Sequence, residues 1–119
     1  MGVTHYRELI VWQKAMDLVE QVYQLSKLFP REEIYGLTSQ VRRAAVSIPS
    51  NIAEGQARKS TAEFRNFLSI SQGSKAEVET QLMIAVRLKY LTPDQAQPPL
   101  LLLEELSRML TALQAKLNQ

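Results

Sequence analysis

Hydrophobic residues recur along most of the chain at intervals of three and four positions, which is the spacing of one face of an α-helix. The first such segment covers residues 6–29, and its apolar positions are Val11, Ala15, Leu18, Val22, Leu25 and Phe29. Proline lacks a backbone N–H and stops a helix, so Pro30 is the expected end of this element. The pattern therefore predicts a first helix over residues 6–29.

A second apolar stripe lies about 100° further round the same helix, because residues one position apart are separated by that angle. Its members are Leu9, Trp12, Met16, Val19 and Tyr23. The two stripes together form an apolar arc wider than the helices of one bundle usually cover. We therefore expect the second stripe to be an oligomer interface, most simply with another copy of the chain.

Three further segments show the same periodicity. A second helix is predicted over residues 37–52, and Gly55 is expected to end it in a left-handed conformation. The capping box from Ser60 to Glu63 predicts the start of a third helix that runs to Thr92, and a fourth is expected to begin after Pro98-Pro99. The apolar positions of the fourth are Leu103, Leu106, Leu110, Leu113 and Leu117.

Short connections between long helices favour antiparallel neighbours. The sequence therefore predicts an all-α fold, an antiparallel up-down-up-down four-helix bundle. A chain of 119 residues suits one domain with its own core, which we expect to cover residues 1–119.

Pro49 lies in the middle of the second predicted helix, where its ring crowds the carbonyl four residues earlier and predicts a kink. The polar residues around it are Arg43, Ser47, Ser50, Asn51 and Glu54. They either face solvent beside a kink that wraps the bundle, or meet residues 73–77 of the third helix in a polar layer that fixes the register.

Composition limits the possible chemistry. The chain has no cysteine and a single histidine, His5, which precedes the first helix, so a disulfide, a di-iron site and a serine–histidine pair cannot be built. We expect no catalytic, cofactor-binding or metal-binding residues; a cation between Glu54 and Glu77 is less ordinary than charge pairing with Arg43. No stretch approaches the roughly 20 apolar residues of a membrane span, so a cytoplasmic protein without membrane contact is expected.

Charge is unevenly distributed, although the net charge is only +2. Residues 42–65 hold five basic residues, which are Arg42, Arg43, Arg58, Lys59 and Arg65. These side chains are candidates for a phosphate-binding patch, with Tyr35 as the aromatic residue available for stacking on a base. Alternatively, they are solvated or paired with Glu54 and Glu63.

The stretch Val46–Gly55, which reads VSIPSNIAEG, resembles a bacterial family of four-helix bundles encoded in intervening sequences of 23S ribosomal RNA genes. The same resemblance includes Tyr6–Leu9, Val11-Trp12, Ala15, Arg58, Gly73-Ser74, Glu77, Glu79–Leu82 and Tyr90-Leu91. The chain departs from the family pattern at Ser71, where alanine is expected, and at Lys89, where glycine is expected.

That family is similar to the accessory variability protein of diversity-generating retroelements, a pentameric ring that binds nucleic acid and its reverse transcriptase. The resemblance implies a pentamer whose partners are RNA or a nucleic-acid-processing protein. We therefore expect a non-enzymatic homo-oligomeric protein that contacts RNA through a basic surface. The alternative is a protein–protein scaffold or accessory subunit that binds no nucleic acid.

Overall fold

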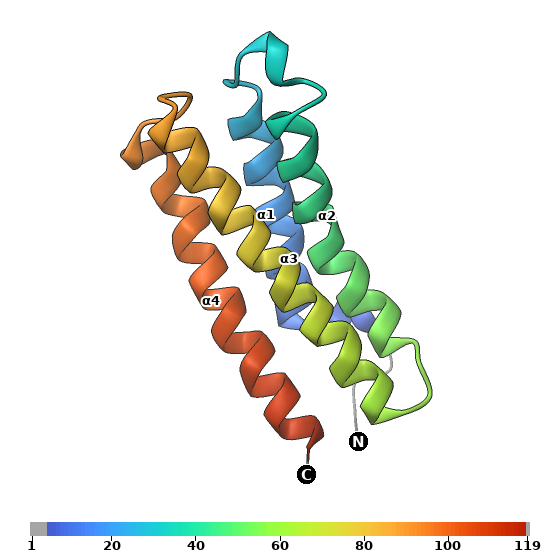
Figure 1. Ribbon diagram of the computed structural model, residues 1–119. Coiled ribbons are helices and arrows are strands. Elements are labelled where there is room, and N and C mark those ends of the chain that lie inside the picture. Colours follow the sequence, from blue (N-terminus) through green and yellow to red (C-terminus); the bar gives the residue numbers. More distant parts are fainter. Residues whose placement is uncertain (1–4, 119) are drawn as a thin grey trace.

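The computed structural model describes residues 5–118 and contains only helices within them. The elements are η1 (Tyr6–Glu8), α1 (Ile10–Ser26), η2 (Arg31–Glu33), α2 (Leu37–Gln56), α3 (Thr61–Arg87) and α4 (Pro93–Leu117), where η marks a 3-10 helix. Figure 1 shows the four α-helices lying lengthwise beside one another, with successive helices running in opposite directions. The predicted all-α, four-helix class is confirmed.

Each helix packs against its neighbours in the sequence, and α4 closes the bundle by packing against α1. The core lies between them and contains the predicted first stripe of α1, of which Val11, Ala15, Leu18 and Val22 are buried. It also contains Leu103, Leu106 and Leu110 of α4. The periodicity thus identified the faces that meet in the core.

The first predicted helix is shorter than expected at both ends. Leu9 has extended backbone angles (φ −76°, ψ 124°), so it separates η1 from α1. A capping box between His5 and Glu8 holds η1, because the His5 ring accepts from a backbone N–H while the Glu8 carboxylate accepts from His5 N. At the other end α1 stops at Ser26, and Phe29 is buried beyond it in the connection.

Gly55 does not end α2 in a left-handed conformation; it lies inside the helix, and none of the described glycines has a positive φ. Its role is to allow close packing. A Cβ at Gly55 would lie 2.6 Å from the Cβ of Phe67 and 3.0 Å from Cδ1 of Phe64, both on α3. The absence of a side chain at this position therefore sets how closely α2 and α3 approach.

The end of α3 comes at Arg87, five residues before the predicted end. Lys89 adopts a left-handed conformation with φ 66°. Tyr90 N donates to the Ala85 carbonyl (2.9 Å) and Lys89 N donates to the Val86 carbonyl (3.0 Å). These two bonds are those of a Schellman motif, which satisfies the last carbonyls of the helix.

The expected start of α4 after Pro98-Pro99 is wrong, because the helix begins at Pro93. Thr92 and Gln95 form a capping box, and proline fits the first helical position because its missing N–H has no acceptor there. Pro98 and Pro99 leave the carbonyls of Asp94 and Gln95 without their helical donors. Both of those residues are exposed, so water can solvate the two carbonyls, while Pro99 is buried in the core.

Among the polar residues around Pro49, Ser47 meets α3, as one of the two sequence interpretations proposed, whereas Ser50 is exposed and Glu54 pairs with Arg58. Ser47 Oγ lies 2.8 Å from Ser74 Oγ, and Asn51 Nδ2 donates to the Ser47 carbonyl (2.8 Å). Ser71 Oγ is buried and donates to the Ile48 carbonyl (3.0 Å). α2 is continuous through Pro49, and the kink there stays a prediction.

Candidate binding surfaces

A groove on the outside of the bundle separates α1 from α2. One wall consists of Trp12, Met16 and Val19 of α1, with Tyr6 of η1, and the other consists of Val46, Pro49, Ser50 and Ala53 of α2. The groove has a volume of about 360 Å³, and we call it the outer groove. It brings three of the five residues of the predicted second stripe of α1 together with an apolar stripe of α2, whereas Leu9 and Tyr23 do not line it.

The five residues predicted as an oligomer interface are covered to different degrees within the single chain. Three of them are half-buried: Leu9, Trp12 and Val19. Met16 is 40% exposed and Tyr23 is 39% exposed, while Val46 across the groove is 40% exposed. One edge of the apolar arc of α1 is therefore uncovered in the single chain.

Arg42 and Arg43, predicted phosphate ligands, have different surroundings. Arg42 is half-buried and joins α2 to α1: its Nε donates to Ser26 Oγ (2.7 Å), and its guanidinium carbon lies 4.8 Å from the centroid of the Tyr23 ring. Arg43 is exposed and lies beside α3. Only Arg43 of this pair has its guanidinium available to a ligand without breaking a contact between helices.

The other predicted cations lie at the far end of α2, since the 16 residues from Arg42 to Arg58 correspond to about 24 Å of helix. Arg58 pairs with Glu54 (2.9 Å), and its guanidinium carbon lies 5.0 Å from the Phe67 ring centroid. Arg65 Nη1 donates to the carbonyl at residue 117 (3.1 Å), which brings it close to the end of α4.

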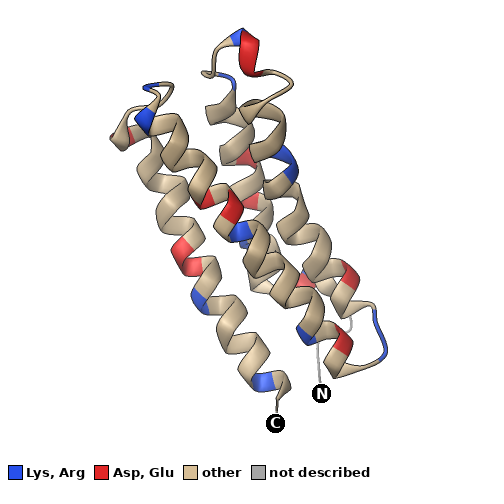
Figure 2. Cartoon of the chain, in the orientation of Figure 1, with Lys and Arg blue, Asp and Glu red and all other residues tan. Residues whose placement is uncertain are grey.

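We call this part of the molecule the basic end and define it by Arg58, Lys59, Arg65 and Lys116. Figure 2 shows the basic positions of the α2–α3 loop, the start of α3 and the end of α4 at the same end of the bundle. Lys59 and Lys116 are exposed. The structure therefore divides the five predicted cations into two separate groups, and adds Lys116 to one of them.

A second depression, the α2–α3 cleft, lies on another face. Its residues include Tyr35 from the connection before α2, Gln40, Arg43 and Ser47 from α2, and Glu77 and Gln81 from α3. Its volume is about 430 Å³. The Gln81 Oε1 atom is buried and accepts no hydrogen bond within the described residues. The cleft therefore combines an aromatic ring, both signs of charge and an unsatisfied acceptor.

The segment that carries Tyr35 is tied to the rest of the fold by Glu33. The Glu33 carboxylate accepts from Leu37 N (2.9 Å), at the start of α2, and from the Tyr90 hydroxyl (2.8 Å). The bond from Leu37 N, followed by that from Tyr90, lowers the pKa of Glu33, and the same carboxylate raises the pKa of Tyr90. A Cβ at Gly36 would lie 2.7 Å from Glu33 Oε1, so glycine leaves room for this contact.

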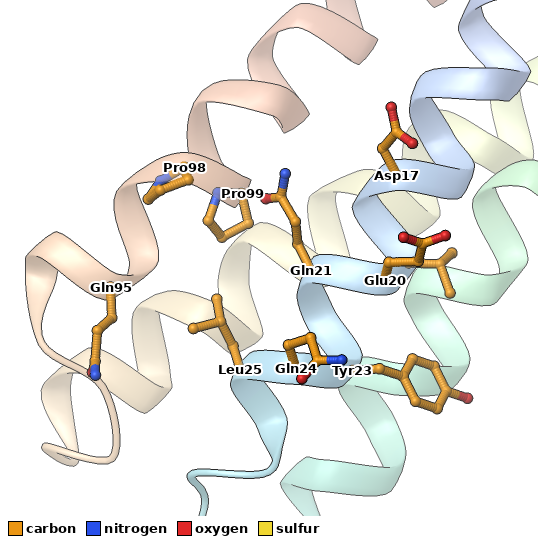
Figure 3. Close-up of a pocket in the computed structure, with 10 residues that line it drawn as sticks. Asp17, Glu20, Gln21, Tyr23, Gln24, Leu25, Gln95, Pro98 and Pro99 are labelled. Atoms are coloured by element: carbon orange, nitrogen blue, oxygen red, sulfur yellow. The ribbon is translucent and has the colours of Figure 1, made fainter.

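A further depression, of about 890 Å³, is formed by α1 and the start of α4. Figure 3 shows the Gln21 side chain directed toward Pro99, whereas Tyr23 points to the other side of α1. Gln21 Oε1 is buried and accepts no hydrogen bond in the described part of the chain. The lining therefore spans two sides of one helix, and it places no charged group of α4 opposite Asp17 or Glu20.

The residues that α2 and α3 contribute to these surfaces were not predicted from the sequence. Val46, Pro49 and Ala53 follow helical spacing outside the core stripe of α2, which is the same signal that identified the second stripe of α1. Glu77 and Gln81 are four residues apart on α3 and therefore share a face, but no local pattern indicates that this face meets Tyr35.

Metal binding and membrane insertion were both unexpected from the composition. Within residues 5–118 no group of three or more histidine, cysteine, aspartate or glutamate side chains is placed to hold a metal ion. No helix of the same range has the length and apolarity needed to cross a bilayer.

The chain was also compared with known proteins. Residues 7–112 match the family model described as 23S rRNA-intervening sequence protein. A solved structure from Bacteroides thetaiotaomicron, described as a protein with unknown function from the S23 ribosomal protein family, is 26% identical. It superposes with a TM-score of 0.81 over 87% of this chain and 97% of its own. The search of curated proteins found no match. The family match covers most of the four-helix region, so the chain belongs to the 23S rRNA-intervening sequence protein family.

Proposed function

We propose that this chain is a non-enzymatic, homo-oligomeric cytoplasmic protein that contacts RNA. The observation that carries self-association is the outer groove, where exposed Met16 and Val46 flank half-buried Trp12. A contiguous apolar patch on the surface of a globular protein usually marks a site of contact with another molecule. A second copy is the simplest partner, because the chain itself supplies matching apolar stripes on α1 and α2.

Five copies is the number we propose, on the resemblance to the ring-forming accessory variability protein. A ring matters for nucleic-acid binding because a single basic end has only four cations, one of which is already paired with Glu54. Repeating this end around a ring gathers several weak phosphate contacts on one assembly. Each contact adds to the affinity by releasing counterions from the nucleic acid.

The basic end supports RNA contact through its unpaired lysines. Lys59 and Lys116 are exposed, and neither forms an ion pair in the part of the chain that the structure describes. Phosphates are therefore the anions we expect beside them, without specificity for sequence. A nucleic-acid-processing protein remains the expected partner if RNA itself is not bound.

The experiment combines solution mass by light scattering with RNA binding measured at several salt concentrations. We expect a mass of several chains, and an RNA affinity that falls linearly with salt on logarithmic axes. Lys59→Gln together with Lys116→Gln should make that slope less steep, because fewer phosphates are neutralised. Lys27→Gln, at an exposed position after α1, is the matched control and should leave the slope unchanged.

Two results would contradict the proposal. A monomer at all concentrations would remove the assembly that repeats the basic end. An oligomer that binds no RNA even at low salt would instead support the scaffold alternative, in which the outer groove and the rest of the surface serve protein contacts alone.

A further inference from the structure

The α2–α3 cleft contains two opposite charges that are not paired with each other. Arg43 and Glu77 are exposed residues on facing helices. Among residues 5–118 neither of them takes part in an ion pair. The cleft therefore offers a cation and a carboxylate to one ligand, which suits a molecule with an anionic group at one point and hydrogen-bond donors at another.

Tyr35 supplies a flat surface beside these charges. Its side chain is 96% exposed, which is the opposite of the usual environment of a large aromatic residue. The backbone around it is held by the bonds of Glu33 to Leu37 and Tyr90, so the ring is carried by an anchored segment. An exposed tyrosine on such a segment is typical of a stacking platform for a nucleobase.

The acceptors of the cleft favour guanine among the four bases. The Glu77 carboxylate has two acceptor oxygens. Gln81 Oε1 is a third acceptor; it is buried and unsatisfied in this conformation, so the Gln81 side chain has to turn toward the cleft to accept from a base. Guanine is the only RNA base with two adjacent donors, N1–H and the N2 amino group, on its Watson–Crick edge. Adenine and cytosine place an acceptor beside their amino group, and uracil has a single N–H, so each presents an acceptor to these oxygens.

We infer that the α2–α3 cleft binds the guanine base of an unpaired RNA nucleotide, with Tyr35 stacking on the base, Glu77 and Gln81 accepting from its Watson–Crick edge, and Arg43 contacting a phosphate. This inference rests on the proposed function, which supplies RNA binding, and it adds which base is recognised. A smaller depression, of about 350 Å³, shares Gln40, Glu77 and Gln81 with the cleft and includes Gly73, where nothing lies within 4 Å of a Cβ position. It gives adjoining nucleotides a path along α3.

The test measures fluorescence anisotropy of two labelled 12-nucleotide RNAs, one repeating UUG and the other repeating UUA. Both have the same charge and the same number of purines, so the ratio of their affinities reports recognition of guanine. We expect the wild-type protein to bind the UUG repeat roughly fivefold to tenfold more tightly, as for one good bidentate contact to a base. Glu77→Gln should bring the ratio close to one, because the amide keeps one acceptor oxygen but replaces the other with an NH2 group, which opposes a donor of guanine.

Matched variants separate base recognition from the general effect of charge. Glu104→Gln removes an exposed carboxylate on α4 and should change both affinities together, leaving the ratio intact. Tyr35→Ala should weaken binding of both RNAs. Unlabelled GMP should compete with the UUG repeat better than AMP does.

Results that would overturn the guanine site differ from results that would overturn RNA binding altogether. Equal binding of the two RNAs by the wild-type protein, or a preference that survives Glu77→Gln, would overturn the guanine site while leaving RNA contact in place. If neither RNA binds at low salt, both the proposed function and this site are overturned. A Tyr35→Ala variant with altered solution mass and unaltered RNA affinity would make the cleft a contact between copies and would overturn the inference.

Discussion

Lys89 is the one described residue other than glycine with a positive φ, at 66°, and it ends α3. In this conformation a Cβ crowds the following carbonyl oxygen, at a cost of roughly 1–2 kcal/mol that glycine avoids. The position was singled out in the sequence because glycine is expected there. The backbone thus keeps a glycine-like turn, although the residue is lysine.

Lys89→Gly is therefore expected to stabilise the protein. Relief of the backbone crowding exceeds the extra freedom that glycine gives the unfolded chain, so we expect about 0.5–1 kcal/mol in the free energy of unfolding. The measurement is the urea midpoint at constant slope. Lys89→Ala removes the same charge and keeps the Cβ, so stabilisation of equal size in this control would show that charge, and not φ, is responsible.

Glu33 links three parts of the chain through one carboxylate, and its ionisation should make stability depend on pH. The backbone bond from Leu37, and then the bond from Tyr90, lower the pKa of Glu33 below its ordinary value of 4.5. Its charged form is therefore favoured in the folded protein. The stabilisation is fully present above the unfolded-state pKa and is lost as the pH falls through the folded-state pKa.

Glu33→Gln should flatten the acid side of the stability profile, because glutamine keeps the shape of the side chain but does not titrate. The check is the urea midpoint of wild type and variant at pH 7 and at pH values below 4.5. Glu32→Gln, on the exposed neighbouring residue, is the control. An acid-induced loss in Glu33→Gln as large as that of the wild type would contradict the assignment.

At the scale of elements, two glycines in long helices have opposite surroundings. Gly55 in α2 meets Phe67 and Phe64 of α3, whereas nothing lies within 4 Å of a Cβ position at Gly73 of α3. The sequence predicted a left-handed helix end at Gly55. Of the two glycines, only Gly55 allows close packing of α2 against α3.

Gly55→Ala and Gly73→Ala should therefore change stability in opposite directions. The new methyl group at position 55 has to push the two helices apart, which we expect to cost about 1–3 kcal/mol. At position 73 alanine adds helix propensity in open space and should stabilise by about 0.5–1 kcal/mol. Thermal and urea unfolding measure both, and a stable Gly55→Ala variant would show that α2 and α3 are less closely fitted than their distances indicate.

Ser71 of α3 provides a hydrogen bond to α2 beside Pro49. It is the second departure from the family pattern, where alanine is expected, and its hydroxyl donates to the Ile48 carbonyl on the residue before Pro49. Ser47, Ser74 and Asn51 continue this polar contact. The hydrogen bonds between α2 and α3 beside the proline help to fix the register of the two helices.

At the scale of the whole molecule, the proposed self-association depends on the outer groove. Met16→Glu places a charge in this groove at a position that is already 40% exposed, so the isolated bundle should still fold. We expect the variant to show a lower solution mass than the wild type in light scattering, with helical circular dichroism unchanged. Met83→Glu, at an exposed position of α3, is the control. An assembly that survives Met16→Glu would place the contact elsewhere.

How much of each candidate surface could be predicted depends on how far apart in the sequence its residues lie. The second stripe of α1 could be identified because helical spacing places its residues on one face. The phosphate patch was predicted from residues close in sequence, but a helix separates Arg42 from Arg58 by about 24 Å, so the five cations form no single surface. Glu77 and Gln81 could not be joined to Tyr35, since nothing local records which helix faces meet.

The sequence by itself determined the helical class, the core faces and the starts of α2 and α3, because periodicity and capping boxes act within a few residues. It did not determine that Pro98-Pro99 lie inside α4, where exposed carbonyls tolerate the missing donors and Pro99 fills the core. Only the tertiary structure decided that Gly55 serves packing, that Arg42 bridges two helices and that the α2–α3 cleft exists. These features depend on contacts between residues distant in sequence, which no local pattern specifies.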